Sequence, residues 1–332
     1  PFRRFCAALT PRNGLTSMNK PNRELRRSIA ISAMLLCIGT DLSLVNAQFA
    51  PKQSSVGTPI AILADERINE SSGIVRSQLH KDCYWTHNDS GDGPVIFLFD
   101  SRGATIARVR VNDADAVDWE DLAILRTPDS PKLIVGDIGN AQPRKHVTLY
   151  VLDEPRLDTK TRVANPTREY AKHWNCKLEI TIPGGTTNYE SLAVDHRDSK
   201  ILLIEKGVLG GRVYSIPLPA NTLSNQVVRS SANLEGRVSV PLATACDISM
   251  DGRTMVIISY QIGFLFQRKA DDKGNIEAWG DALAREPVSF SLGKLRQTEA
   301  VCFSEDEKSV IVTSEFTPTP VVEIKLPSAE KL

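Results

Sequence analysis

The stretch SLAVDHRDSKILLIEKG, residues 191–207, contains the pattern that decides the fold. It reads as a short strand, a polar turn, and a strongly apolar second strand that ends in polar residues. Runs of aliphatic and β-branched residues bounded by turn-forming residues are typical of β-strands. The stretch therefore predicts two neighbouring antiparallel strands.

Four more segments have the same pattern, and aligning all five on the second strand reveals a repeat. The segments are residues 72–91, 120–139, 244–261 and 299–316. The equivalent opening positions are Ser72, Glu120, Glu190, Thr244 and Glu299, and the gaps between them are 48, 70, 54 and 55 residues. A period of roughly 50 residues fits a four-stranded propeller blade.

Each unit is followed by further strand-like segments. Third strands are expected at 95–100, 148–155, 211–218, 263–269 and 321–326, and fourth strands at 104–111, 177–182, 227–234 and 287–292. The fifth unit lacks a fourth strand, and PIAILADERI (59–68) precedes the first unit. An N-terminal strand that completes the last blade closes a propeller without exposed edges. We therefore predict an all-β fold, a single five-bladed β-propeller over 58–332; six blades is the alternative, because the 70-residue gap could hold a degenerate unit.

The N-terminal residues differ from the rest in charge and hydropathy. Residues 1–47 contain seven Lys/Arg and two Asp/Glu, so the remainder has 33 basic and 38 acidic residues and a net charge of −5. From Met18 a basic stretch, a short apolar run and small residues before Ala47 follow the order of a secretory signal peptide. We expect an upstream extension (1–17), a signal peptide (18–47) and a linker (48–57), and a secreted or periplasmic protein.

Several classes of function and partner receive no support. The mild acidity of the remainder gives no indication of nucleic-acid binding. We expect no membrane span after removal of the signal, and a monomer. Export permits disulfides, but the spacing of Cys83, Cys176, Cys246 and Cys302 does not fit a zinc site, and buried thiols pack well as small apolar residues. We expect free, buried cysteines.

Polar residues recur at two positions of every unit. If the first strand lines a central channel and the second runs antiparallel beside it, the start of one and the end of the other lie at the same channel mouth. The second strands end at Asp89, Asp137, Lys206, Tyr260 and Glu315. With the opening positions, these residues place six carboxylates and one lysine at the mouth. In VDWEDLAI (117–124), alternation puts Leu122 and Ile124 on one strand face and Asp121 and Ala123 on the other, with Trp119 packed on the next blade.

Six nearby carboxylates would raise one another's pKa unless a cation compensates them. A hard cation with oxygen ligands, calcium or a similar divalent ion, is one solution; a hydrated mouth in which Lys206 compensates part of the charge is the other. The candidate metal ligands are Glu120, Asp137, Glu190 and Glu299. Candidate ligand-binding residues are Ser72, Arg144, Lys206, Thr244, Tyr260 and Glu315.

His87 and Asp89 are the candidates for acid–base catalysis, because histidine is the usual residue for this role. A structural role for His87 is the alternative. Arg144 could pair with the carboxylates of the mouth or bind an anionic substrate. The motifs GxSxG and HExxH and the P-loop are absent from the sequence.

The motifs WTHNDSGD, DWEDLAI, GDIGN and ACDISMDG resemble those of a group of exported bacterial β-propeller proteins without a settled activity. The resemblance covers most of 70–315 and implies the fold and export. The acidic mouth is also loosely similar to that of calcium-dependent propeller hydrolases, the phytase-like and lactonase-like ones. Such enzymes carry a catalytic histidine pair, whereas only His87 and His146 are candidates in this chain.

Two functional hypotheses follow. In the first, the exported propeller binds an unknown small-molecule or surface ligand at an acidic mouth that contains a calcium-like ion. In the second, the same mouth is a metal-dependent hydrolase site for a phosphoester, ester or lactone, where the ion polarises the substrate or activates water. A propeller fold is compatible with both.

Overall fold

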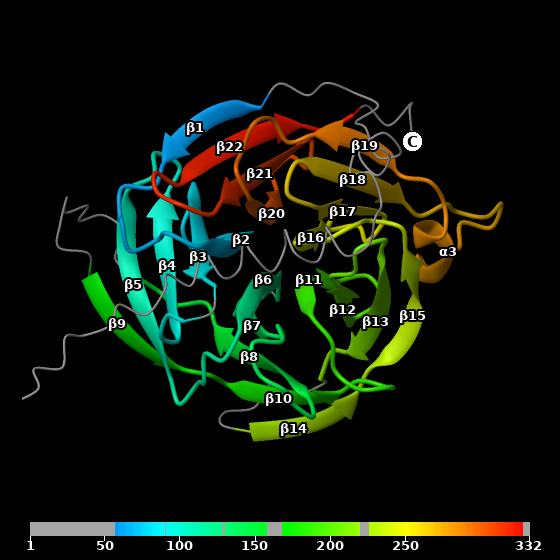
Figure 1. Cartoon of the computed structure of the whole chain (residues 1–332), viewed down its shortest axis with the longest axis horizontal. Helices are drawn as coiled ribbons and strands as arrows, with labels where there is room; N and C mark the ends of the chain where they lie inside the picture. Colours follow the sequence, from blue (N-terminus) through cyan, green and yellow to red (C-terminus); the bar gives the residue numbers. More distant parts are fainter. Residues whose placement is uncertain (1–56, 90, 128–129, 158–167, 220–225, 328–332) are drawn as a thin grey trace, which may run out of the picture. The chain divides into compact units, whose positions relative to one another are not determined.

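Five β-sheets surround a central axis as the blades of a β-propeller (Figure 1). The computed structural model describes residues 57–327 except 90, 128–129, 158–167 and 220–225. The innermost strand of each blade contacts the innermost strands of the blades on either side. The prediction of a five-bladed all-β propeller is therefore confirmed, and the six-bladed alternative is wrong.

The blades are numbered here in the chain order of their inner strands, and four antiparallel strands form the body of each. Blade 1 contains β2 (Ser71–Arg76), β3 (Cys83–Asn88), β4 (Val95–Asp100) and β5 (Thr105–Asn112). Blade 2 contains β6 (Trp119–Leu125), β7 (Lys132–Asp137), β8 (Val147–Asp153) and β10 (Cys176–Thr181). Blade 3 contains β11 (Tyr189–Asp195), β12 (Lys200–Glu205), β13 (Gly211–Pro217) and β15 (Asn233–Val238). Blade 4 contains β16 (Ala245–Ile248), β17 (Thr254–Ile258), β18 (Ile262–Gln267) and β19 (Val288–Ser291). Blade 5 contains β20 (Thr298–Phe303), β21 (Ser309–Ser314), β22 (Pro320–Lys325) and β1 (Thr58–Ile62).

The hydrophobic core lies between the blades. Successive residues of a strand point to opposite faces of its sheet, so each inner strand packs on two neighbours. Leu122 and Ile124 of β6 pack in a cluster shared with blade 1, whereas Ala123 packs in a cluster shared with blade 3. Trp119 is 2% exposed and belongs to the cluster shared with blade 1. The alternation predicted for this strand and the packing role of its tryptophan are both confirmed.

The ring is closed by strands from opposite ends of the described chain. β1 pairs antiparallel with β22, with Pro59 opposite Val322 and Ile62 opposite Pro320. Ile60 and Ala61 pack against apolar residues shared by blades 5 and 1. The N-terminal strand therefore completes the last blade, as predicted.

Two additional strands link neighbouring blades. β9 (Arg168–His173) pairs parallel with β5 of blade 1, although it lies between two strands of blade 2 in the sequence. β14 (Gln226–Ser231) pairs parallel with β10 of blade 2 and lies between two strands of blade 3. The 70-residue gap thus contains a linking strand. The prediction that residues 227–234 form the fourth strand of blade 3 is wrong. Most of this segment belongs to β14, and the fourth strand of blade 3 is β15.

A short helix, α3 (Trp279–Leu283), packs against β15 and β18. Within the described ranges, no helix has the length and apolarity needed to cross a membrane. Cys83, Cys176, Cys246 and Cys302 are buried and unpaired, as expected. The residues predicted to form a signal peptide (18–47) and an upstream extension (1–17) lie outside the described residues, as does the predicted linker apart from its last residue.

Candidate metal centre at the channel mouth

Strand register brings the predicted polar positions to one end of the ring. Trp119 pairs with Asp137 across β6 and β7, and Thr298 pairs with Ser314 across β20 and β21. The start of an inner strand therefore lies beside the end of the second strand in the same blade. Figure 1 shows the inner strands β2, β6, β11, β16 and β20 nearest the centre. We define the acidic mouth as the buried carboxylates at this end, Asp89, Asp118, Glu120, Glu190, Glu299 and Glu315.

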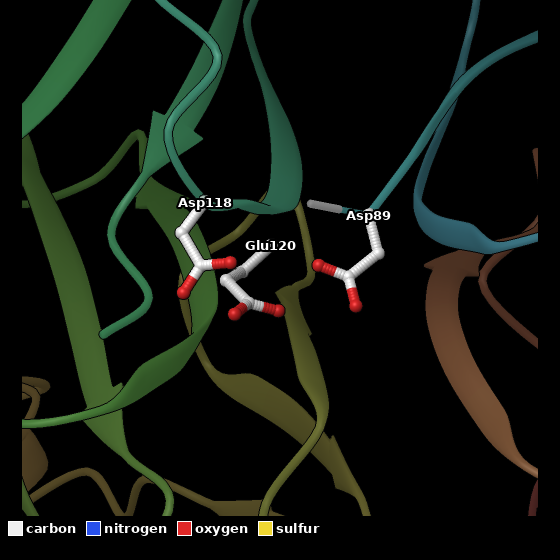
Figure 2. A group of neighbouring side chains, drawn as sticks. All are labelled: Asp89, Asp118 and Glu120. Atoms are coloured by element: carbon white, nitrogen blue, oxygen red, sulfur yellow. The ribbon is translucent and has the colours of Figure 1, made fainter. Parts of the chain in front are cut away.

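Two groups of three carboxylates in the acidic mouth are close enough to hold a metal ion. In each group, one oxygen from every residue lies within 4.8 Å of the others. The first group is Asp89, Asp118 and Glu120, whose carboxylates converge in Figure 2. The second is Asp89, Glu299 and Glu315. Because Asp89 belongs to both groups, blades 1, 2 and 5 contribute to one continuous acidic surface.

The loop after β7 holds the first group from one side. The backbone N–H of Ala141 donates to Asp118 Oδ2 at 2.5 Å, and the N–H of Ile138 donates to the Asp118 carbonyl at 3.1 Å. A Cβ atom at Gly139 would clash with carboxylate oxygens of both Glu120 and Asp118. Gly139, the second glycine of the GDIGN stretch, is therefore needed for the close approach of these two side chains to the loop.

Burial and mutual repulsion raise the pKa of several carboxyl groups in the acidic mouth. The pKa of Glu120 lies well above its ordinary value, because the side chain is buried and because Glu190, Asp89 and Asp118 are negatively charged neighbours. Among the described residues, no hydrogen bond or ion pair reaches the Glu120 carboxylate. Burial followed by repulsion from Glu299 raises the pKa of Glu315 to about 9. These groups take up protons unless a cation compensates their charge.

Glu190 is compensated differently, because Lys206 forms an ion pair with it. Asn188 Nδ2 donates to its other oxygen at 2.6 Å. Burial nevertheless raises the pKa of Glu190 to about 7. The Lys206 ammonium also lies 5.0 Å from the centre of the Tyr260 ring, and burial raises the pKa of Tyr260 to about 12. The structure therefore places one lysine on the side of blades 3 and 4, where its charge acts on both Glu190 and Glu299.

Two other predicted residues form an ion pair at the edge of the mouth. Arg144 Nη1 donates to Asp137 Oδ1 and to the Asp137 carbonyl, both at 2.8 Å. Asp137 Oδ1 also accepts the backbone N–H of Asp118 at 3.0 Å. Asp137, predicted as a metal ligand, belongs to neither of the two groups of carboxylates that are close enough to hold a metal ion. The pair fixes the start of β6, and this arrangement matches the structural alternative considered for Arg144.

Two predicted ligand-binding hydroxyls join neighbouring blades. Ser72 Oγ donates to the Glu120 carbonyl at 2.6 Å, and Thr244 Oγ1 donates to the Thr298 carbonyl at 2.8 Å. Both residues are 1% exposed. Their hydroxyls are thus used within the ring.

His87 lies between blades 1 and 2. It is fully buried, its ring packs edge-on against Trp119 at 5.6 Å, and Nδ1 lies 2.9 Å from the Asn88 carbonyl. Burial lowers the pKa of the imidazole. This position favours the structural role for His87, whereas Asp89, the other candidate for catalysis, lies in the acidic mouth. The candidate ligands Glu120, Glu190 and Glu299 lie there too.

Sequence reasoning did not assign Asp118 as a ligand, nor Gln297 as a positioning residue. Asp118 precedes Glu120 by two residues and lies directly before β6, whose register with β7 shifts at Glu120. Gln297 precedes Glu299 by the same spacing, and its Nε2 donates to Glu315 Oε2 at 2.8 Å and approaches Glu299 Oε1 at 3.4 Å. The sequence therefore contained a pattern that could have identified both residues: a second polar residue two positions before the opening position of the repeat.

Neither a protein-family model nor a curated protein matches this chain. Closely spaced carboxylate oxygens from three blades are suited to a hard divalent cation, and Lys206 supplies a fixed positive charge beside them.

Proposed function

We propose that this protein is an exported β-propeller that binds a calcium-like divalent cation at the acidic mouth and binds an oxygen-containing ligand through that ion. The observation that carries the proposal is the pair of carboxylate groups that share Asp89. Each group offers three oxygens, and calcium takes six to eight oxygen ligands, supplied by carboxylates, carbonyls and water. A ligand molecule can supply those that remain.

The charge distribution supports a cation rather than an empty mouth. Six buried carboxylates face one ammonium, which is already paired with Glu190. Glu120 is 5% exposed. A buried carboxylate without a compensating partner is unfavourable in its charged form. Binding a divalent cation beside it would remove this cost.

Binding is the function supported best, because the geometry favours no particular acid–base residue. His87, the histidine candidate, is buried against Trp119. The residues that converge are the oxygen ligands themselves. The proposal therefore assigns Asp89, Asp118, Glu120, Glu299 and Glu315 to the cation, and Glu190 with Lys206 to charge balance beside it.

The test is calcium binding by the chain without residues 1–47, before and after the substitution Glu120→Gln. We expect calcium to raise the melting temperature of the unsubstituted protein, and EDTA to reverse the effect, because a ligand of the folded state stabilises it by mass action. Glu120→Gln removes one charged ligand and is expected to weaken calcium affinity at least about tenfold, or about 1.4 kcal/mol. Calorimetric titration measures the affinity.

Glu169→Gln is the matched control, because Glu169 is an exposed glutamate on β9 that pairs with Arg108. It is expected to leave calcium affinity unchanged. Absence of calcium binding by the unsubstituted protein would refute the proposal, and equal affinities for the Glu120 and control variants would show that the ligands are assigned wrongly.

A further inference from the structure

The end of the ring opposite the acidic mouth contains basic side chains. Inner strands run from the acidic mouth to this far end, so the residues at their C-terminal ends gather there. Arg76 is the last residue of β2, Arg126 directly follows β6, and His196 directly follows β11. The three strands are neighbours around the axis, because β6 contacts both β2 and β11. We call Arg76, Arg126 and His196 the far basic group.

Contacts between blades fix the position of Arg126. Its backbone N–H donates to His196 Nε2 at 3.0 Å. Nε2 is therefore the unprotonated nitrogen of the ring, and Nδ1 carries the proton of the neutral imidazole. Burial lowers the pKa of His196, and the charge of Arg126 acts in the same direction. The imidazole is thus a neutral group that holds the backbone of Arg126.

Three buried nitrogens of the far basic group have no hydrogen-bond partner among the described residues. They are Nε of Arg76, Nε of Arg126 and Nδ1 of His196. The Arg126 guanidinium forms no ion pair with any residue that the structure describes. Buried donors in proteins are nearly always satisfied by protein, water or a ligand. Three such donors, contributed by three adjacent blades, lie at this end of the ring.

The carboxylates around this group are already engaged in other contacts. Asp247 accepts the backbone N–H groups of Ile248 and Phe303, both at 2.8 Å. Glu307 accepts the N–H of Met250 at 2.7 Å. Glu305 approaches Arg76 at 3.6 Å, but its side chain is 75% exposed, so solvent screens this pair. None of these carboxylates satisfies the buried donors.

We propose that the far basic group binds a small oxyanion such as phosphate or sulfate at the end of the ring opposite the acidic mouth. The guanidinium groups supply charge and directed N–H donors, which suit planar and tetrahedral oxyanions. The imidazole N–H supplies a third donor. Burial lowers the pKa of Arg126; the charge of Asp247 opposes this effect, and the charge of Arg76 adds to it. An anion would relieve the repulsion between the two arginines.

The experiment measures binding of inorganic phosphate to the protein in EDTA, at constant ionic strength maintained with chloride. EDTA separates this site from the acidic mouth, because binding there would require the divalent cation. We expect phosphate to raise the melting temperature relative to chloride, and we expect Arg126→Gln to weaken phosphate affinity at least tenfold, about 1.4 kcal/mol. Sulfate and acetate, titrated in parallel, distinguish a tetrahedral oxyanion from a carboxylate as the preferred ligand.

Arg110→Gln is the matched control, because Arg110 is an exposed arginine of β5 on the outer part of blade 1. It is expected to bind phosphate as the unsubstituted protein does. If Arg126→Gln fails to fold, Arg76→Gln tests the same group, and Arg126→Lys is expected to retain part of the affinity. Equal stabilisation by phosphate and chloride, or phosphate affinity unchanged by both Arg126→Gln and Arg76→Gln, would overturn the proposal.

Discussion

At the residue scale, adjacent carboxylates of the same strand have opposite environments. Asp121 Oδ1 accepts the N–H of Leu122 at 2.8 Å, and Asp121 Oδ2 accepts the N–H of Leu192 at 2.8 Å. It therefore connects blade 2 to blade 3 as a buried structural group. Glu120 points to the acidic mouth, where other carboxylates surround it. The register shift between Trp119 and Asp121, at Glu120, separates the candidate ligand from the structural acid.

The first prediction concerns Gly139, which lies against Glu120 and Asp118. Gly139→Ala inserts a methyl group where the carboxylate oxygens lie, so these side chains must move apart. We expect calcium affinity to fall at least about tenfold, with a smaller loss of stability than a core truncation, which costs about 2–5 kcal/mol. Calorimetry and denaturant unfolding measure the two effects.

Gly93→Ala serves as the control for this prediction, because a Cβ at Gly93 has only Arg110 Nη1 near it, at 4.0 Å. The control is expected to bind calcium normally. Normal calcium affinity in Gly139→Ala would mean that the cation does not use the carboxylates next to this loop.

At the element scale, strands that pair with a blade other than that of their sequence neighbours link the blades of the ring. β9 and β14 each lie between two strands of one blade in the sequence but pair with the outer strand of the preceding blade. β1 performs the closing role between the two ends of the propeller. The edge strand TPIAI therefore adds to the direct contacts between the first and last blades, which β2 makes with β20 and β21.

The second prediction is that deletion of residues up to 62 destabilises the whole ring. The deletion exposes the edge of β22 and removes Ile60 and Ala61 from the apolar cluster shared by blades 5 and 1. We expect the free energy of unfolding to fall by about 3 kcal/mol, since a buried aliphatic side chain contributes about 1.5–3 kcal/mol and backbone pairing is also lost. Urea unfolding measures the change.

Two variants serve as controls for this deletion. Removal of only residues 1–47 retains β1, and removal of 328–332 deletes residues that follow the last strand; neither is expected to change stability. An unaltered urea midpoint after deletion up to residue 62 would show that the closing strand contributes little.

At the scale of the whole molecule, the acidic mouth makes stability depend on pH. In the metal-free protein the raised pKa values, about 7 for Glu190 and about 9 for Glu315, mean that the folded state binds protons more tightly than the unfolded state. Their contribution to stability is complete below the ordinary glutamate pKa and is lost as the pH rises through these values. Glu120 acts in the same direction.

The third prediction is that calcium stabilises the protein more at high pH than at low pH. Calcium competes with protons for the same carboxylates. The increase in melting temperature caused by saturating calcium should therefore grow between about pH 5 and about pH 8, while the metal-free protein becomes less stable over that range. Thermal unfolding in EDTA and in calcium at each pH measures both curves. Equal calcium shifts at the two pH values would show that these carboxyl groups do not bind the ion.

Much of the fold could be predicted from the sequence, because strand periodicity and turn chemistry are local. The five openings at Ser72, Glu120, Glu190, Thr244 and Glu299 gave the blade number, and PIAILADERI identified the closing strand. The fourth strand of blade 3 was misplaced for a physical reason. QVVRSS and NLEGRV are both plausible strands, and the choice between pairing with β10 and with β13 depends on contacts between blades.

The candidate site was predictable only as a set of positions. Register placed Glu120, Glu190 and Glu299 at one mouth, since antiparallel pairing brings strand ends together. Which oxygens converge depends on the distances between blades, so the two groups around Asp89 could be identified only from the tertiary structure. The same holds for the burial of His87 and for the unsatisfied donors of Arg76 and Arg126. Local pattern determined the strands and the end of the ring to which each side chain belongs; packing of one blade on the next determined which of those side chains lie close enough to act together.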